Sequence, residues 1–268
     1  MIPFHDDNPT SRFPWLTLVL IGINVFAYVH IERLSSDKRQ ILAYRRGFMP
    51  ARIDQLKDPN LVIEVPVVTT KAVEQRDRFR RRFLIEVAEQ ETLTLHADRR
   101  EILTSLLTCM FLHGGWLHLI GNMWFLWLFG NNVEDRLGPL LFLVLYLFGG
   151  LLGSGCHYLN DVHSQVPVIG ASGAVATVLG AYAITWPWAR VRTLVFLFIF
   201  VTIIDLPALM VLGGWFLIQL LEVTKEGVAP IAFWAHIGGF LAGVVLMPFF
   251  SSAVDARRPK PKPPDDSW

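Results

Sequence analysis

Apolar runs separated by short polar connections dominate the pattern of the chain. A helix needs about 20 mainly apolar residues to cross a bilayer, and a shorter one can do so where protein shields it. Six runs meet one of these conditions, at 13–31, 112–130, 139–158, 171–187, 207–222 and 230–250. The pattern therefore predicts an all-α membrane protein with six transmembrane helices.

Two apolar segments need a separate interpretation. The first span follows a short polar stretch, lacks a small-residue cleavage site and is too long for a signal-peptide core, so we expect a retained anchor. The segment Thr193–Ile204 is separated from the next span by Asp205 and Pro207, and it is rich in β-branched and aromatic residues. We expect an interfacial or re-entrant segment there, with a seventh helix as the less favoured alternative.

The composition supports a membrane protein. Hydrophobic residues make up 53% of the chain and charged residues 18%, and the mean hydropathy is +0.42. A soluble domain of this size would carry more charge, and a net charge of +1 gives no case for nucleic acid as a partner. Cys109 and Cys156 both lie in apolar surroundings, so we interpret them as packing residues rather than a disulfide or metal ligands.

The polar parts of the chain flank and interrupt the apolar core. Residues 1–12 form a short N-terminal segment, and residues 32–100 mix arginines, acidic residues and apolar pairs, as expected of an extramembrane loop or small subdomain. The run Arg80–Arg82 leaves contact with lipid headgroups as an alternative role. Prolines and basic residues in 251–268 are typical of a disordered tail. The remaining core, 101–250, contains five of the six expected helices.

The distribution of basic residues predicts the orientation in the membrane, because lysine and arginine in short connections resist translocation. With six spans, the N-terminus, two connections and the tail share one side and carry Arg12, Arg136, Arg190, Arg192, Arg257, Arg258, Lys260 and Lys262. On the other side, the 159–170 loop has no basic residue and the 223–229 loop has Lys225 alone. Both termini are therefore expected in the cytoplasm.

A serine and a histidine within the apolar spans suggest catalytic chemistry. Ser172 lies in Gly170-Ala171-Ser172-Gly173, and His236 lies in the last span. Serine is common in membrane helices because its hydroxyl can bond to the preceding turn, so Ser172 alone means little. An ionisable imidazole facing lipid is costly, so His236 is a functional candidate by default. Together they could supply a nucleophile and its base.

Small residues recur at helical spacing beside both side chains. The two stripes are Ser172, Ala176 and Gly180 on one helix, and His236, Gly239 and Gly243 on the other. Stripes of this kind let two helices pack closely in lipid. If the stripes face each other, Ser172 and His236 meet near the outer side of the membrane.

A third element carries His118 and Asn122, which are four residues apart and share one helix face. An imidazole and a carboxamide side by side can donate hydrogen bonds to a developing oxyanion, and the alternative is a polar pair that holds helices together. His113 is off that face and is expected to be structural. The zinc signature His-Glu-x-x-His is absent and the histidines lack further ligands, so we predict no metal site.

The order of these motifs resembles that of the rhomboid family of intramembrane serine proteases. The matching stretches are Phe111–Met123, Glu134–Gly138, Gly170–Gly173, and Ala235–Gly239 with Gly243. They occur in the family's order across 101–250, and the first span fits as well. Residues 54–100 contain none of these motifs and look like an enlarged first loop.

The resemblance implies a six-transmembrane-helix rhomboid-like bundle that needs no cofactor. It implies a Ser172–His236 dyad with no acidic third member, and His118 and Asn122 as oxyanion donors. It further implies structural roles for Gly170, Gly173, Gly239, Gly243, Glu134 and Arg136. One position departs from the pattern, because some bacterial relatives pack an aromatic residue on the histidine ring where this chain has Ala176. A looser dyad, or an aromatic from elsewhere, is expected in its place.

The expected function is hydrolysis of peptide bonds in single-span membrane protein substrates, in or near the segment that spans the bilayer. The 223–229 loop, with Lys225, Gly227 and Pro230 at its end, is the expected cap over the site, and this loop and the fifth span together form the expected gate. The alternative is a non-catalytic rhomboid-like protein that binds transmembrane helices. The expected location is a cell membrane, namely a bacterial inner membrane.

Overall fold

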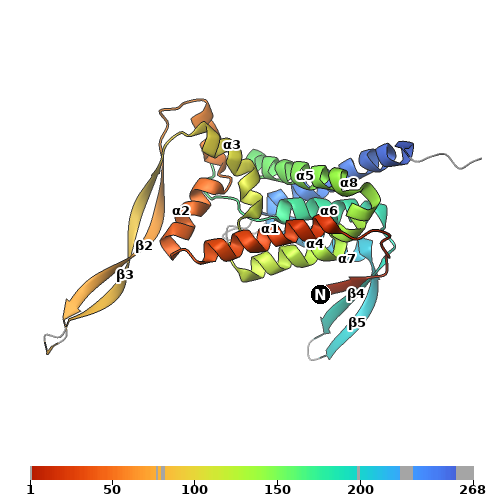
Figure 1. Ribbon diagram of the computed structural model, residues 1–268, viewed down its shortest axis with the longest axis horizontal. Helices are drawn as coiled ribbons and strands as arrows, with labels where there is room; N and C mark the ends of the chain where they lie inside the picture. Colours follow the sequence, from red (N-terminus) through yellow and green to blue (C-terminus); the bar gives the residue numbers. More distant parts are fainter. Residues whose placement is uncertain (1, 77, 80–81, 198–199, 224–231, 258–268) are drawn as a thin grey trace, which may run out of the picture.

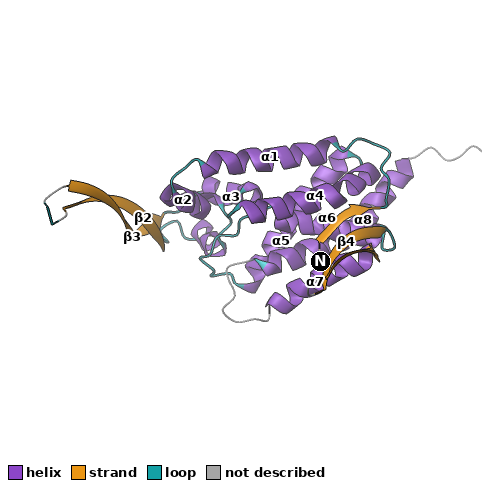
Figure 2. Ribbon diagram, turned by 90° about the horizontal axis from the view of Figure 1, so that it is seen from below, coloured by secondary structure: helices purple, strands orange, loops and turns teal. Residues whose placement is uncertain are grey.

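A bundle of apolar helices forms the body of the fold, with a long β-hairpin at one end and a small β-sheet at the other (Figure 1, Figure 2). The computed structural model describes residues 2–76, 78–79, 82–197, 200–223 and 232–257. The bundle helices are α1 (Trp15–Glu32), α3 (Arg99–Thr108), α4 (Trp116–Leu137), α5 (Pro139–Asn160), α6 (Ser172–Thr185), α7 (Ala208–Val223) and α8 (Phe233–Arg257).

The helices differ in how well each could cross a bilayer. Within the described ranges, α1, α5 and α8 are long and apolar enough to do so. The pair formed by Arg99–Phe111 and α4 would be a fourth span, bent by 77°. Helices α6 and α7 are apolar but shorter. The short α6 is buried from Gly173 to Ala183, so neighbouring helices shield the helix that carries the candidate serine.

The expectation of an all-α protein is wrong, because the chain also forms β-structure. Strands β1 (Ile2–Asp6), β4 (Arg190–Leu197) and β5 (Phe200–Pro207) form an antiparallel sheet in the order β1-β4-β5. The described residues of Thr193–Ile204 therefore belong to two paired β-strands and not to a seventh helix. The β-branched and aromatic residues of this segment favour extended structure, and strand pairing satisfies backbone groups that a short re-entrant loop would leave free.

The N-terminal strand β1 is held against the helices by side chains as well as by β4. The Trp124 indole of α4 donates to the Pro3 carbonyl oxygen over 2.7 Å. The Asp6 carboxylate accepts from the Tyr182 hydroxyl over 2.7 Å and from the Asn132 amide over 2.8 Å. The sheet thus joins the start of the chain to α4 and α6.

Residues 32–100 include a small subdomain built around the second hairpin. It contains α2 (Ser36–Arg46), η1 (Pro50–Leu56), β2 (Ile63–Arg76) and β3 (Arg82–Leu95). The two strands pair without a register shift from Ile63 opposite Leu95 outward, and the hairpin projects away from the bundle (Figure 1). Near its base, Ile63, Val65 and Leu95 pack with Met49 in a second apolar core. Farther out, Lys71 pairs with Glu89 and Glu91 across the strands, which raises the pKa of its ammonium group.

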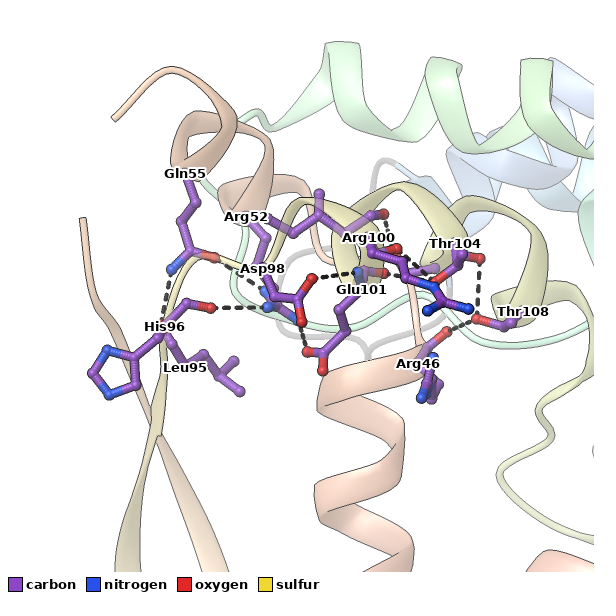
Figure 3. A network of polar contacts seen from close by, with 12 residues as sticks. Arg46, Arg52, Gln55, Leu95, His96, Asp98, Arg100, Glu101, Thr104 and Thr108 are labelled. Carbon is purple, nitrogen blue, oxygen red and sulfur yellow. Dashed lines mark hydrogen bonds and ion pairs between the residues drawn. The ribbon is translucent and has the colours of Figure 1, made fainter. Parts of the chain in front are cut away.

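A buried arginine connects this subdomain to the bundle (Figure 3). Arg52 is 3% exposed; its guanidinium binds Glu101 of α3 over 2.6 Å and also donates to Gln55 and to the His96 carbonyl oxygen. Gln55 in turn donates to the Leu95 carbonyl oxygen at the end of β3. The network fixes the base of the hairpin to the first turn of α3.

The C-terminal part departs from expectation in one respect. Residues 251–257 are not a disordered tail, because helix α8 continues through Pro248 and ends at Arg257. Residues 258–268 lie outside the described part of the chain, as does the expected cap at 223–229 apart from Val223 itself.

Candidate active site

Ser172 and His236 lie in contact at the meeting point of two helices. Ser172 is the first residue of α6, and His236 lies in the first turn of α8. The Ser172 Oγ and His236 Nε2 atoms are 2.8 Å apart. That is hydrogen-bond distance, so the hydroxyl can pass its proton directly to the ring. The position of Ser172 at a helix N-terminus leaves its own N–H without an intrahelical acceptor.

The segment that leads into Ser172 is held in an extended path. Val168 and Phe48 exchange backbone hydrogen bonds of 3.0 and 2.8 Å, and the Gly170 N–H donates to the Cys109 carbonyl oxygen over 2.9 Å. Gly170 has a φ of 125°, in the region that favours glycine, and a Cβ there would lie 2.6 Å from His118 Nε2. Gly170 thus lets the backbone turn into α6 with the His118 ring alongside.

His118 and Asn122 face the same cavity as Ser172. Both belong to α4, where their spacing puts them on one helix face as expected. The Asn122 Nδ2 is buried and has no hydrogen-bond partner among the described residues. Because Asn122 lines the cavity, this donor is available to a bound group. His113 lies off that face, with its ring 5.1 Å from that of His118.

The small-residue stripes of α6 and α8 face each other. A Cβ on Gly239 would overlap the carbonyl oxygen of Gly173, and one on Gly243 would overlap that of Thr177. In the opposite direction, a Cβ on Gly180 would overlap the carbonyl oxygen of Phe240. The two backbones therefore touch directly, and this contact sets the distance between the helices that carry Ser172 and His236.

Aromatic side chains from positions other than 176 lie close to the His236 ring. The Trp215 ring of α7 lies 6.0 Å from the imidazole at 35°, and the Phe233 ring lies 6.1 Å away, edge-on. An aromatic from another helix thus takes the place expected of an aromatic at 176. The Gln219 Oε1 of α7 also lies 2.8 Å from His236 Nδ1. The sequence interpretation missed Gln219, although a single amide in an otherwise apolar stretch of α7 was a usable signal.

Glu134 and Arg136 connect the far end of α4 to its neighbours. The Glu134 carboxylate accepts from the Leu16 N–H over 2.9 Å and from the Thr17 N–H and hydroxyl over 2.7 Å each, which caps the start of α1. Arg136 makes a two-point ion pair with Asp255 of α8. Both side chains thus act on helix packing, away from Ser172.

The candidate site opens into a cavity of about 1360 Å³. It is mainly apolar and extends from the dyad past Trp215 and Gln219 to the 166–169 segment and to Tyr44 of α2. A space of this size can hold an extended peptide segment together with water. In the described part of the chain, no group of three or more His, Cys, Asp or Glu side chains could hold a metal ion.

Comparison with known proteins shows to which family the chain belongs. Residues 100–253 match the Rhomboid domain, which is more than half of the chain. The chain belongs to the rhomboid family. RHOMBOID-like protein 5 of Arabidopsis thaliana is 36% identical over 254 residues, which are 91% of this rhomboid chain and 70% of the plant protein.

Mitochondrial relatives match over a shorter length. The presenilin-associated rhomboid-like protein of Homo sapiens is 29% identical over 56% of the chain, and Rhomboid protein 1 of Saccharomyces cerevisiae is 28% identical over 63%. The rhomboid chain spans 39% and 48% of those two proteins. The chain is thus a multi-pass membrane protein, and its named relatives are eukaryotic, so the expected bacterial inner membrane has no support from them.

Proposed function

We propose that this rhomboid protein is an intramembrane serine endopeptidase that uses Ser172 as nucleophile and His236 as general base. The observation that carries the proposal is the 2.8 Å contact between Ser172 Oγ and His236 Nε2 at the wall of a large cavity. Membership of the rhomboid family also supports it. A serine hydroxyl is a weak nucleophile alone, and a neighbouring imidazole activates it.

In the first half of the proposed reaction, Ser172 Oγ attacks the scissile carbonyl carbon while its proton moves to His236 Nε2. The negative charge on the carbonyl oxygen is stabilised by donors from His118, Asn122 and the Ser172 N–H. The tetrahedral intermediate formed by this attack then collapses, which breaks the C–N bond, and His236 gives its proton to the departing amine. An ester between Ser172 and the substrate remains.

In the second half, water enters the cavity and hydrolyses the ester. His236 removes a proton from the water as its oxygen attacks the same carbonyl carbon, and the proton then returns to Ser172 Oγ. The reaction needs no cofactor. The histidines and Asn122 on the cavity wall supply polar contacts for water at a site that lies among apolar helices.

The proposed arrangement in the membrane uses six spans, with the bent α3–α4 pair as one and the short helices α6 and α7 as two more. The start of α1 lies against Glu134 near the end of α4, and Arg136 of α4 pairs with Asp255 near the end of α8. These three helix ends gather at one end of the bundle, next to the β1-β4-β5 sheet (Figure 1). Arg190 and Arg192 lie in that sheet, so this end is assigned to the cytoplasm, with both termini. The enlarged hairpin then lies on the opposite side.

Substrates of the proposed enzyme are single-span membrane proteins. A peptide bond inside a regular helix is shielded by its own turn, so cleavage requires a segment that unwinds, as helices do near small or helix-breaking residues. The cavity beside the dyad would take such a segment in extended form.

The proposal is tested by labelling the purified protein with a fluorophosphonate in detergent. We expect loss of fluoride and a covalent bond between phosphorus and Ser172 Oγ, located by peptide mapping. Ser172→Ala and His236→Ala should each abolish labelling and cleavage of a single-span substrate in liposomes, with thermal midpoints close to that of the unmodified protein. Binding of substrates without labelling or cleavage would instead establish a non-catalytic helix-binding protein.

A further inference from the structure

Gln219 of α7 contacts the catalytic candidate His236 on the side away from Ser172. Its Oε1 lies 2.8 Å from His236 Nδ1, while His236 Nε2 lies 2.8 Å from Ser172 Oγ. We propose that Gln219 is a positioning residue that holds the His236 ring in the one tautomer and orientation that can accept the serine proton. This inference rests on the proposed protease function.

The orientation of the Gln219 amide is fixed by a second contact. Its Nε2 donates to the carbonyl oxygen of Trp215 over 3.3 Å, and a carbonyl oxygen can only accept. The amide oxygen is therefore the end that faces His236. A carbonyl oxygen beside Nδ1 requires that Nδ1 carry the proton, which leaves the lone pair of Nε2 free for the Ser172 hydroxyl.

The placement of Gln219 argues against an incidental polar residue. The buried residues of α7 are Ala208, Leu212 and Gln219, so the amide lies on the face that packs inward and is 7% exposed. An amide that served only its own helix would be satisfied by the Trp215 carbonyl. Without His236, the amide oxygen of Gln219 would be buried with no hydrogen-bond partner, which is costly.

A neutral amide suits this location better than a carboxylate. A charged side chain between membrane helices is expensive, and a buried carboxylate would need further donors. Glutamine supplies an acceptor without that cost, as the asparagine does in the Cys-His-Asn sites of papain-like proteases. The site therefore uses three helices: α6 supplies the hydroxyl, α8 the imidazole and α7 the group that orients the imidazole.

The proposal predicts a spectroscopic signature that does not depend on turnover. In protein with ¹⁵N-labelled histidine, the His236 signals should report one tautomer, with the proton on Nδ1. In Gln219→Met, whose side chain has a similar length but no oxygen, we expect a mixture of tautomers. Leu217→Met is the matched control, because Leu217 is 54% exposed on the same helix and should leave the His236 signals unchanged.

Kinetics provide the second readout. Gln219→Met should lower kcat and the rate of fluorophosphonate labelling by about 10- to 100-fold with KM nearly unchanged, since loss of the correct tautomer affects the chemical step. Gln219→Glu keeps an acceptor and should restore most of the rate. Its carboxylate would also favour the protonated imidazole, so the midpoint of the acidic limb of the kcat/KM profile should move to higher pH.

The outcomes separate this inference from the function on which it rests. Unmodified protein that is not labelled at Ser172 overturns the protease itself. Labelled protein in which Gln219→Met keeps a single His236 tautomer and its full kcat overturns the role of Gln219 alone. If Gln219→Met proves too unstable to study, an acidic limb in Gln219→Glu that coincides with that of the unmodified protein overturns it equally.

Discussion

Gly239 of α8 lies directly against the carbonyl oxygen of Gly173, the residue that follows Ser172, with no space for a Cβ atom between them. We therefore expect Gly239→Val to force α8 away from α6 and to carry His236 with it. A displacement of about 1 Å at a catalytic pair can lower the rate by about 100-fold. The measurements are cleavage of a single-span substrate and the thermal midpoint in detergent, and both should fall.

Gly22→Val is the matched control for that change. Gly22 lies in α1, is exposed, and a Cβ there would meet nothing within 4 Å. The control should therefore keep its activity, with a midpoint close to that of the unmodified protein. Full activity and an unchanged midpoint in Gly239→Val would show that the two helices do not depend on this contact.

The oxyanion donors are expected to affect turnover rather than binding. His118→Ala or Asn122→Ala should lower kcat by roughly 10- to 1,000-fold with little change in KM, because these donors act on charge that develops in the transition state. Ile120→Ala, on the exposed side of the same helix, should leave both constants unchanged. If both single variants and the double variant turn over normally, the pair serves only to pack helices.

Removing the charge of Glu134 should destabilise the bundle without touching the chemistry. The buried carboxylate accepts from two N–H groups and one hydroxyl at the start of α1. In Glu134→Gln an amide NH₂ group replaces one carboxylate oxygen and faces an N–H donor at the start of α1. We therefore expect a loss of about 1–3 kcal/mol in the free energy of unfolding. Unfolding in mixed micelles with increasing denaturing detergent measures it. A midpoint equal to that of the unmodified protein would contradict this role.

Arg52 should anchor the base of the β2–β3 hairpin to the bundle. Arg52→Met leaves the Glu101 carboxylate without its partner at a half-buried position, and breaking a buried ion pair in this way costs about 3–5 kcal/mol. Limited proteolysis should then cut within 57–98 much faster, while substrate cleavage persists. Lys57→Met removes an exposed pair with Asp54 and should not change the digestion rate. Equal digestion of both variants would exclude Arg52 as the anchor.

The helical part of the fold could be predicted because each long helix carries its own apolar pattern. The runs that predicted α1, α5 and α8 satisfy a requirement of the bilayer that does not depend on the rest of the chain. The β4–β5 hairpin was missed for the opposite reason. The apolar run Thr193–Ile204 does not by its periodicity separate a helix from a strand, and its pairing within itself and with Ile2–Asp6 decides between them.

Part of the candidate site could likewise be predicted from the sequence, and part could not. Ser172, His236, His118 and Asn122 could be named because their spacing on each helix and their motifs are local. For Gln219 the sequence shows only a single amide in an apolar stretch, because its role depends on how α7 is rotated against α8, which brings Oε1 to His236 Nδ1. The geometry between two helices is set by the packing of whole faces, and it is absent from either helix alone.

The pairing of β1 with β4 has a consequence for synthesis of the protein. Tyr182, whose hydroxyl donates to the Asp6 carboxylate, leaves the ribosome 176 residues after Asp6. At about 5–20 residues per second, that gap lasts roughly 10 to 35 seconds. During this time α1, α4 and α5 can enter the membrane while the first strand has neither its sheet nor its hydroxyl donor. The N-terminal strand is therefore among the last parts of the nascent chain to reach its native place, and a chain stalled before β4 would display it unpaired.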